Sequence, residues 1–200
     1  MNAKEIFTMY CQKKRLFIQP FLADFWVICL CRGSFFSAEV FEKLGDPAPI
    51  FRFSGFLGQN GAHETVWEGS CRTPIGLFRL TEGFYQGKKP KTDWPLFAVT
   101  PQTYWIDDPS SLFYNRPITQ EGPPRCSCEA MADYPEYSCG FGFSYNRFPP
   151  LPGRGSAFFF HCGDHPTHGC LAAEKPTVLA LLSQLSETKK PKIAILKREE

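Results

Sequence analysis

The residues best suited to do chemistry in this chain are a histidine and a cysteine that lie close together, His161 and Cys170. His161 ends an aromatic run, residues 158–160, and Cys170 directly follows Gly169, with a turn rich in Gly and Pro between them. A cysteine nucleophile needs a base to take its proton and backbone N–H groups to hold the oxyanion. The segment therefore predicts nucleophilic catalysis with Cys170 as the nucleophile and His161 as the base.

Each of these side chains also has a structural interpretation. Cys170 could be a buried thiol without function, and His161 a core histidine with its hydrogen bonds satisfied. His168 lies two residues before Cys170, so an extended backbone would place both side chains on one face, where the imidazole could steer a substrate. His165 lies beside a proline, which is typical of a solvated loop residue.

The same segment contains five residues of the types that bind zinc, namely His161, Cys162, His165, His168 and Cys170. Their spacing is close to that of a zinc knuckle, but a knuckle lacks the preceding core strand and carries one more regularly spaced ligand. We expect no metal and no cofactor, and keep a non-catalytic zinc- or wall-binding module as an alternative from another class.

Hydrophobic patterning predicts a mainly β protein with some α structure. Residues 25–31 form a continuous apolar run that is typical of a buried strand, and residues 35–42 alternate enough to be its hairpin partner. A second core strand, residues 157–160, should present His161 at its exposed C-terminal end. Further strands are expected at residues 50–57, 97–100, 104–106, 140–145 and 193–196, and residues 72–80 are expected to be a turn that enters a strand.

Two further segments bear on the position of Cys170. The apolar stripe of residues 178–185 predicts one helix that begins near Glu174, too late for Cys170 to cap it. Any contribution of the helix dipole to a thiolate is therefore modest. Residues 107–128 are rich in Pro, Gly and Ser and are expected to form a long loop, and such loops are often functional.

Composition limits the classes of protein. The chain has 200 residues, of which 43% are hydrophobic and 21% charged, as expected for one soluble domain, with or without an appendage. A net charge of +2 gives no reason to expect nucleic acid as a partner, and no run reaches the ~18 apolar residues of a membrane span. Nine cysteines are an odd number, so we expect mostly buried thiols and leave a partial set of disulfides open.

The N-terminal region has the outline of an export signal, but an unconvincing one. Lys13, Lys14 and Arg15 precede an apolar stretch, residues 16–31, which Pro20 and Asp24 interrupt, and no small-x-small cleavage site follows. We therefore expect residues 1–24 to be an N-terminal extension with a helix at about residues 3–14, and residues 25–200 to be the catalytic domain.

An ordered set of motifs resembles the L,D-transpeptidase (YkuD-type) catalytic domain. The family pattern is a strand that ends in His, followed by Ser or Thr, any residue, Gly, Cys and a hydrophobe. The matching elements here are Phe160-His161, Thr167-His168-Gly169-Cys170-Leu171, Thr73-Pro74-Ile75-Gly76-Leu77-Phe78, Trp105-Ile106-Asp107-Asp108-Pro109, Tyr114-Asn115 and Tyr145-Asn146. The combination is specific, whereas any single element would be weak.

This resemblance implies a β-sandwich of mixed sheets with one helix after the catalytic Cys170, located in the cell envelope. It also implies that peptidoglycan stem peptides are the partners: Cys170 forms a thioester and releases D-alanine, and an amine then forms a 3→3 cross-link. A backbone carbonyl near Cys162 or Gly163 would orient His161. The remaining roles are an oxyanion hole from backbone N–H groups of His168, Gly169 and Cys170, and substrate or loop support from Thr167, His168, Tyr145 and Asn146.

The chain departs from the family pattern at two places. The interval between His161 and Cys170 is shorter than in most members, and Ala172 stands where many members carry Arg or Asn. Both departures bear on how donor and acceptor are oriented. An L,D-carboxypeptidase or another thiol hydrolase on the same scaffold therefore stays open as the alternative within the enzyme class.

Overall fold

The computed structural model describes residues 1–16 and 25–198, which form a mainly β protein with two α-helices. The helices are α1 (Ala3–Lys13) and α2 (Lys175–Gln184), with short 3₁₀ turns η2 (Met131–Asp133), η3 (Pro135–Ser138) and η4 (Glu187–Lys189). The strands are β1 (Trp26–Arg32), β2 (Phe35–Phe41), β3 (Phe51–Phe56), β4 (Ala62–His63), β5 (Thr73–Pro74), β6 (Gly76–Tyr85), β7 (Leu96–Ala98), β8 (Thr103–Ile106), β9 (Arg116–Thr119), β10 (Cys128–Ala130), β11 (Cys139–Phe143), β12 (Phe159–Cys162), β13 (Leu171–Ala173) and β14 (Lys192–Lys197). The expected mainly β class is confirmed, as is the helix after Cys170.

The main sheet closes on itself, so the expected sandwich of packed sheets is replaced by a barrel. Its strand order is β11-β12-β13-β3-β2-β1-β14-β6-β7, and β11 also pairs with β6. The cause is the length of β6, whose ten residues pair first with β14, through Gly76–Arg79, and then with β11, from Leu80 to Tyr85. Closure leaves the strands from β11 round to β6 without the free edges of an open sheet, while β7 pairs, among the described strands, only with β6, outside the closed ring.

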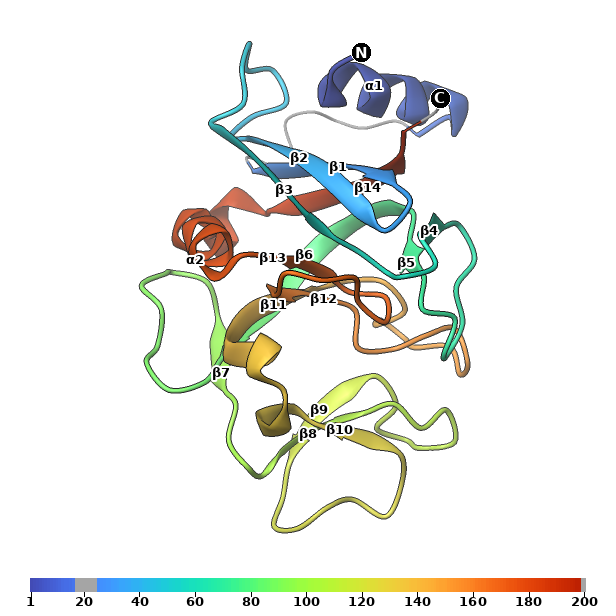
Figure 1. Cartoon of the computed structure of the whole chain (residues 1–200), viewed down its shortest axis with the longest axis vertical. Coiled ribbons are helices and arrows are strands. Elements are labelled where there is room, and N and C mark those ends of the chain that lie inside the picture. The colour runs from blue at the N-terminus through green and yellow to red at the C-terminus, as the bar shows by residue number, and fades with distance from the viewer. Residues whose placement is uncertain (17–24, 199–200) are drawn as a thin grey trace.

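Strand β1 shows why a continuous apolar run is needed at this place. Its alternate residues Val27, Cys29 and Cys31 face the barrel core, while Trp26, Ile28 and Leu30 pack under α1. Figure 1 shows α1 lying over β1 and β14 at the top of the molecule. Helix α1 begins at an Asn2 capping box, as its sequence favours. Residues 17–24, with Pro20 and Asp24 of the signal-like stretch, lie outside the described residues.

The long segment of residues 107–128 is more structured than its composition predicted. It contains β9 and leads into β10, and both strands pair with β8 in a separate three-stranded sheet, at the bottom of Figure 1. A third apolar cluster, which includes Trp105, Phe159 and Cys170, lies where this sheet meets the barrel. The small sheet therefore covers the side of the barrel that carries Cys170.

The cysteines behave mainly as the sequence predicted. All nine lie in the described part of the chain and are free thiols, six of them buried. Two come close together, because Cys139 and Cys162 lie opposite each other on β11 and β12 with their Sγ atoms 3.4 Å apart. Within the described ranges, no helix is long and apolar enough to cross a membrane.

Candidate active site

His161 lies inside β12 and is buried, with only 6% of the residue exposed. The expected core strand is thus shifted by two residues toward the C-terminus, and the expected exposed position of His161 is wrong. The physical reason is the parallel pairing of β12 with β13, which continues through His161 and Cys162. Because side chains alternate along a strand, Phe160 enters the barrel core while His161 and Phe159 face the small sheet.

The imidazole of His161 is held in one orientation. Its Nδ1 lies 2.7 Å from the carbonyl oxygen of Cys162, and the ring of Tyr137 packs edge-on against it at 5.5 Å. A carbonyl only accepts, so Nδ1 carries the proton and Nε2 of the neutral ring is an acceptor. Burial, the largest cause, lowers the pKa of His161, so the ring is neutral at physiological pH and able to take a proton.

The thiol of Cys170 is buried and already hydrogen-bonded. It donates to the carbonyl of Ala157 at 3.1 Å and accepts from the amide of Phe159 at 3.3 Å. Among the described residues it makes no hydrogen bond to His161, although both side chains line one cavity of about 480 Å³. Burial raises the pKa of Cys170 well above its ordinary value, and the charge of Glu129 adds to this. The resting pair is therefore a neutral thiol and a neutral imidazole.

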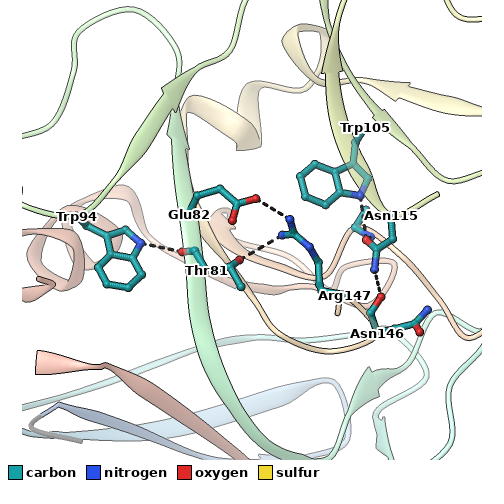
Figure 2. Close-up of polar contacts among 8 residues, drawn as sticks. Thr81, Glu82, Trp94, Trp105, Asn115, Asn146 and Arg147 are labelled. Atoms are coloured by element: carbon teal, nitrogen blue, oxygen red, sulfur yellow. Dashed lines mark hydrogen bonds and ion pairs between the residues drawn. The ribbon is translucent and has the colours of Figure 1, made fainter. Parts of the chain in front are cut away.

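Ala157, whose carbonyl holds the thiol, is itself held at its backbone N–H by Asn115, which is 1% exposed. Asn115 Oδ1 accepts from the backbone N–H of Ala157 and from the indole of Trp105, both at 3.1 Å, while its amide donates to Asn146 O. Figure 2 shows this amide between Trp105 and Asn146, beside the pair that Arg147 forms with Glu82. Asn115 was noted in the sequence only as part of a motif, and the structure shows what it contacts.

Two threonines brace the loop that carries Cys170. Thr167 Oγ1 donates to the carbonyl of Cys170 at 2.7 Å and accepts from the amide of Gly169 at 3.1 Å. Thr73, completely buried, donates to the carbonyl of Gly169 at 2.8 Å and accepts from the amide of Gly58. The amide of Gly169, expected in an oxyanion hole, is therefore occupied by Thr167 in this structure.

Gly169 has a backbone conformation and surroundings that only glycine suits. Its φ is +143°, and an added Cβ would lie 2.9 Å from the ring of Phe158 and 3.0 Å from the carbonyl of Arg72. A side chain here would therefore displace the loop immediately before Cys170.

We predict that Thr73→Val, which keeps the shape but removes the hydroxyl, destabilises the fold and slows reaction at Cys170. The carbonyl of Gly169 and the amide of Gly58 would lose a buried partner, which costs about 1–3 kcal/mol. Urea denaturation measures the stability and acylation kinetics measure the rate. The exposed Thr188→Val serves as the control, and an unchanged free energy of unfolding for Thr73→Val would contradict the prediction.

The other predicted residues divide between the cavity and its surroundings. Exposed His168 and His165 both line the cavity, and His165 pairs with Asp164. Tyr145 and Asn146 do not line it. Tyr145 packs on Phe158, while the Asn146 side chain hydrogen-bonds to the backbone of Leu151 and Gly155 in the loop before β12. Ala172 is buried within β13, opposite Phe56 of β3, so its side chain does not line the cavity.

The raised pKa of Cys170 makes a prediction about thiol chemistry in the free protein. A thiolate forms only as the pH approaches and passes the thiol pKa, which here lies above the ordinary ~8.5. The rate of iodoacetamide alkylation at Cys170, followed by peptide mapping, should therefore rise through pH 7–9.5 without levelling off. A plateau below pH 8 would mean that the resting pair is ionised.

Carboxylates of the cavity were missed by sequence reasoning. Glu68, Asp107, Glu129 and Glu136 all line it, from segments far apart in the chain. Asp107 was quoted in a motif without a role, and the others gave no signal, because only the tertiary fold brings them to Cys170. Among the described residues, no group of three His, Cys, Asp or Glu side chains is arranged to hold a metal.

A thiol and a neutral imidazole that line one cavity, beside a closed β barrel, define a site of the cysteine–histidine class. The family model described as the L,D-transpeptidase catalytic domain, YkuD, matches residues 44–193. The chain therefore belongs to the L,D-transpeptidase catalytic domain family, as its motifs suggested.

Two further comparisons add little. One solved structure, that of the helical cell shape determining protein Pgp2 from Campylobacter jejuni, is similar with 16% identity and a TM-score of 0.48. The match covers 88% of this chain and 48% of that one, so this chain spans about half the length of that protein. No curated protein matches the chain.

Proposed function

We propose that this protein is a peptidoglycan L,D-transpeptidase of the cell envelope that forms 3→3 cross-links through a thioester on Cys170. The observation that carries the proposal is the shared cavity, in which the thiol of Cys170 and the oriented, neutral imidazole of His161 both face the same space. Membership of the family supports the class of reaction and the peptidoglycan substrate.

In the proposed first step, the thiol leaves the carbonyl of Ala157 and turns to His161. Nε2 of His161 takes the thiol proton while the sulfur attacks the carbonyl carbon of the third residue of a tetrapeptide stem. Backbone N–H groups of His168 and Cys170 stabilise the oxyanion. The C–N bond then breaks, the proton passes from His161 to the leaving nitrogen, and D-alanine departs from the thioester.

In the second step, an amine of a neighbouring stem attacks the thioester carbon. His161 removes the proton of this amine and returns it to the sulfur as the C–S bond breaks. The product is an amide between two third residues. Water in place of the amine would give a tripeptide, and the reaction would be that of an L,D-carboxypeptidase.

Product analysis tests the proposal directly. The purified protein is incubated with disaccharide tetrapeptide, and the products are separated and fragmented by mass spectrometry. A dimer that has lost one D-alanine and carries a 3→3 bond is expected. Tripeptide and free D-alanine without any dimer would replace the transpeptidase by the hydrolase, and no conversion by folded protein would contradict both.

A further inference from the structure

The cavity at Cys170 has an acidic wall and is also lined by three histidines, of which His165 lies 3.9 Å from Glu136. Four carboxylates line it, and no lysine or arginine does so among the described residues. Glu68 lies in the loop before β5, Asp107 directly follows β8, Glu129 is in β10 and Glu136 is in η3. Strand β10, which carries Glu129, pairs with β8, and the backbone N–H of Asp107 donates to the carbonyl of Ser127 just before β10.

Two of these carboxylates, Asp107 and Glu68, act on a third, Glu129. Burial raises the pKa of Glu129 to about 7, and the charges of Asp107 and Glu68 add to this, while a hydrogen bond from Tyr137 opposes it. The hydroxyl of Tyr137 donates to Glu129 at 2.6 Å, and that of Tyr114 donates to Glu68. Like charges gathered in a partly buried space repel one another, and a cation placed among them would relieve the repulsion.

Asp107 provides a second, separate observation that favours a hydrogen-bond donor in this cavity. Its Oδ1 atom is buried and has no hydrogen-bond partner among the described residues. A buried acceptor without a donor costs about 1–3 kcal/mol, and such atoms are few in native proteins. Oδ1 is shielded from solvent in the resting protein, so a ligand that brings N–H donors into the cavity would satisfy it after the Asp107 side chain rotates.

We propose that Glu68, Asp107 and Glu129 form an ammonium-binding wall of the Cys170 cavity, which binds the side-chain amine of a diamino acid at the third position of the donor stem. This inference rests on the proposed function. An ammonium group has three donors and no acceptor, so it can bond to several carboxylates at once. The reacting carbonyl belongs to that same third residue, so its side chain lies within reach of the wall.

The acceptor amine is a poorer occupant of the same wall. An amine must lose its proton before it attacks a thioester, and nearby carboxylates raise the pKa of an ammonium group and so keep it protonated. The wall therefore suits an amine that binds and does not react.

Binding of the ammonium group also bears on Cys170. The negative charge of Glu129 is one of the causes that raise the pKa of the thiol. An ammonium group beside Glu129 compensates that charge, so the thiol gives up its proton to His161 more readily when the donor is bound. Among the described residues, the titratable groups near Glu129 are Tyr137, Tyr134, the thiols of Cys170 and Cys128, and the carboxylates of Asp107 and Glu68.

The test measures equilibrium binding in the full-length Cys170→Ala protein, where no turnover interferes. The probes are the tetrapeptide L-Ala-γ-D-Glu-L-Lys-D-Ala and its twin acetylated on the lysine amine. We expect the free amine to bind about tenfold more tightly, a difference of about 1.4 kcal/mol. Asp107→Asn or Glu129→Gln, added to Cys170→Ala, should reduce this ratio to about twofold. Glu42→Gln, at a carboxylate paired with Lys189 outside the cavity, should leave it unchanged.

The pH dependence gives a second readout. A carboxyl whose pKa is about 7 is mostly neutral at pH 6 and mostly charged at pH 8, so the preference for the free amine should increase between these values. Glu129→Gln should abolish the increase. The amide oxygen of the new side chain can still accept from Tyr137, and thermal denaturation checks the fold; if that variant does not fold, Asp107→Asn decides.

The outcomes separate the two proposals. Equal binding of both peptides by the parent site, or an unchanged preference in Asp107→Asn and Glu129→Gln, overturns the ammonium wall and leaves the transpeptidase proposal standing. Binding of neither peptide overturns the wall. Whether the transpeptidase proposal falls with it is then decided by product analysis of the unsubstituted protein.

Discussion

Cys170→Ala should abolish covalent labelling by a carbapenem, whereas the parent protein should gain the mass of one carbapenem molecule. The thiol attacks the β-lactam carbonyl, the ring C–N bond breaks, and the proton moves to the nitrogen, so the whole molecule is retained as an acyl adduct. Cys170 and the oriented His161 line the same cavity, so a base is available to this thiol. Turnover should fall on the order of 10⁶-fold, as when a nucleophile is removed from a catalytic triad.

The control for this result is a second cysteine of the same cavity. Cys71 also lines the cavity and is partly exposed. If labelling requires His161 as the base, and not only a thiol that the carbapenem can reach, the Cys71→Ala protein should still carry the adduct. Cys170→Ala leaves the carbonyl of Ala157 and the amide of Phe159 without the sulfur, which costs about 1–3 kcal/mol. Thermal denaturation should therefore show a folded protein. Intact-mass spectrometry in which Cys170→Ala still carries the adduct would refute the assignment of the nucleophile.

The sequence was sufficient for the parts of the site that are local in the chain. Strand β1, its hairpin with β2 and helix α2 follow from short-range patterns, and each is present. The carbonyl that orients His161, which the family resemblance implied, is that of Cys162. Hydrophobic patterning is a local signal, so it can be read from a short window of sequence. The family motifs placed Cys170 and His161 at one site for the same reason.

Properties that depend on contacts between segments far apart in the chain could not be predicted from the sequence. Closure of the barrel depends on β6 pairing with both β14 and β11, which are separated by helix α2 and two strands. The carboxylates of Glu68 and Glu129 meet only because the small sheet covers the barrel. Ala157 accepts from the thiol of Cys170 through its carbonyl and donates through its N–H to Asn115, a residue of yet another segment. Such contacts leave no periodicity in the sequence.

His161→Gln should slow acylation of Cys170 by about 10²- to 10⁴-fold at pH 7, the usual contribution of a general base. Since burial raises the pKa of the thiol, very little thiolate exists at pH 7 without a base to take the proton. Burial lowers the pKa of His161, so the neutral form that can act as the base is the one present. Glutamine can still donate to the carbonyl of Cys162 but cannot accept a full proton.

The pH profile distinguishes a lost base from a disturbed fold. Hydroxide can deprotonate the thiol when the base is gone, so the deficit of His161→Gln should shrink steadily from pH 7 to pH 9.5. A structural defect would lower the rate by a similar factor at every pH. His165→Gln, an exposed histidine of the same cavity, should remain within about twofold of the parent protein, in line with the small effects of exposed substitutions. Equal losses of acylation rate in both variants would contradict the assignment of His161 as the base and would indicate a general disturbance of the cavity.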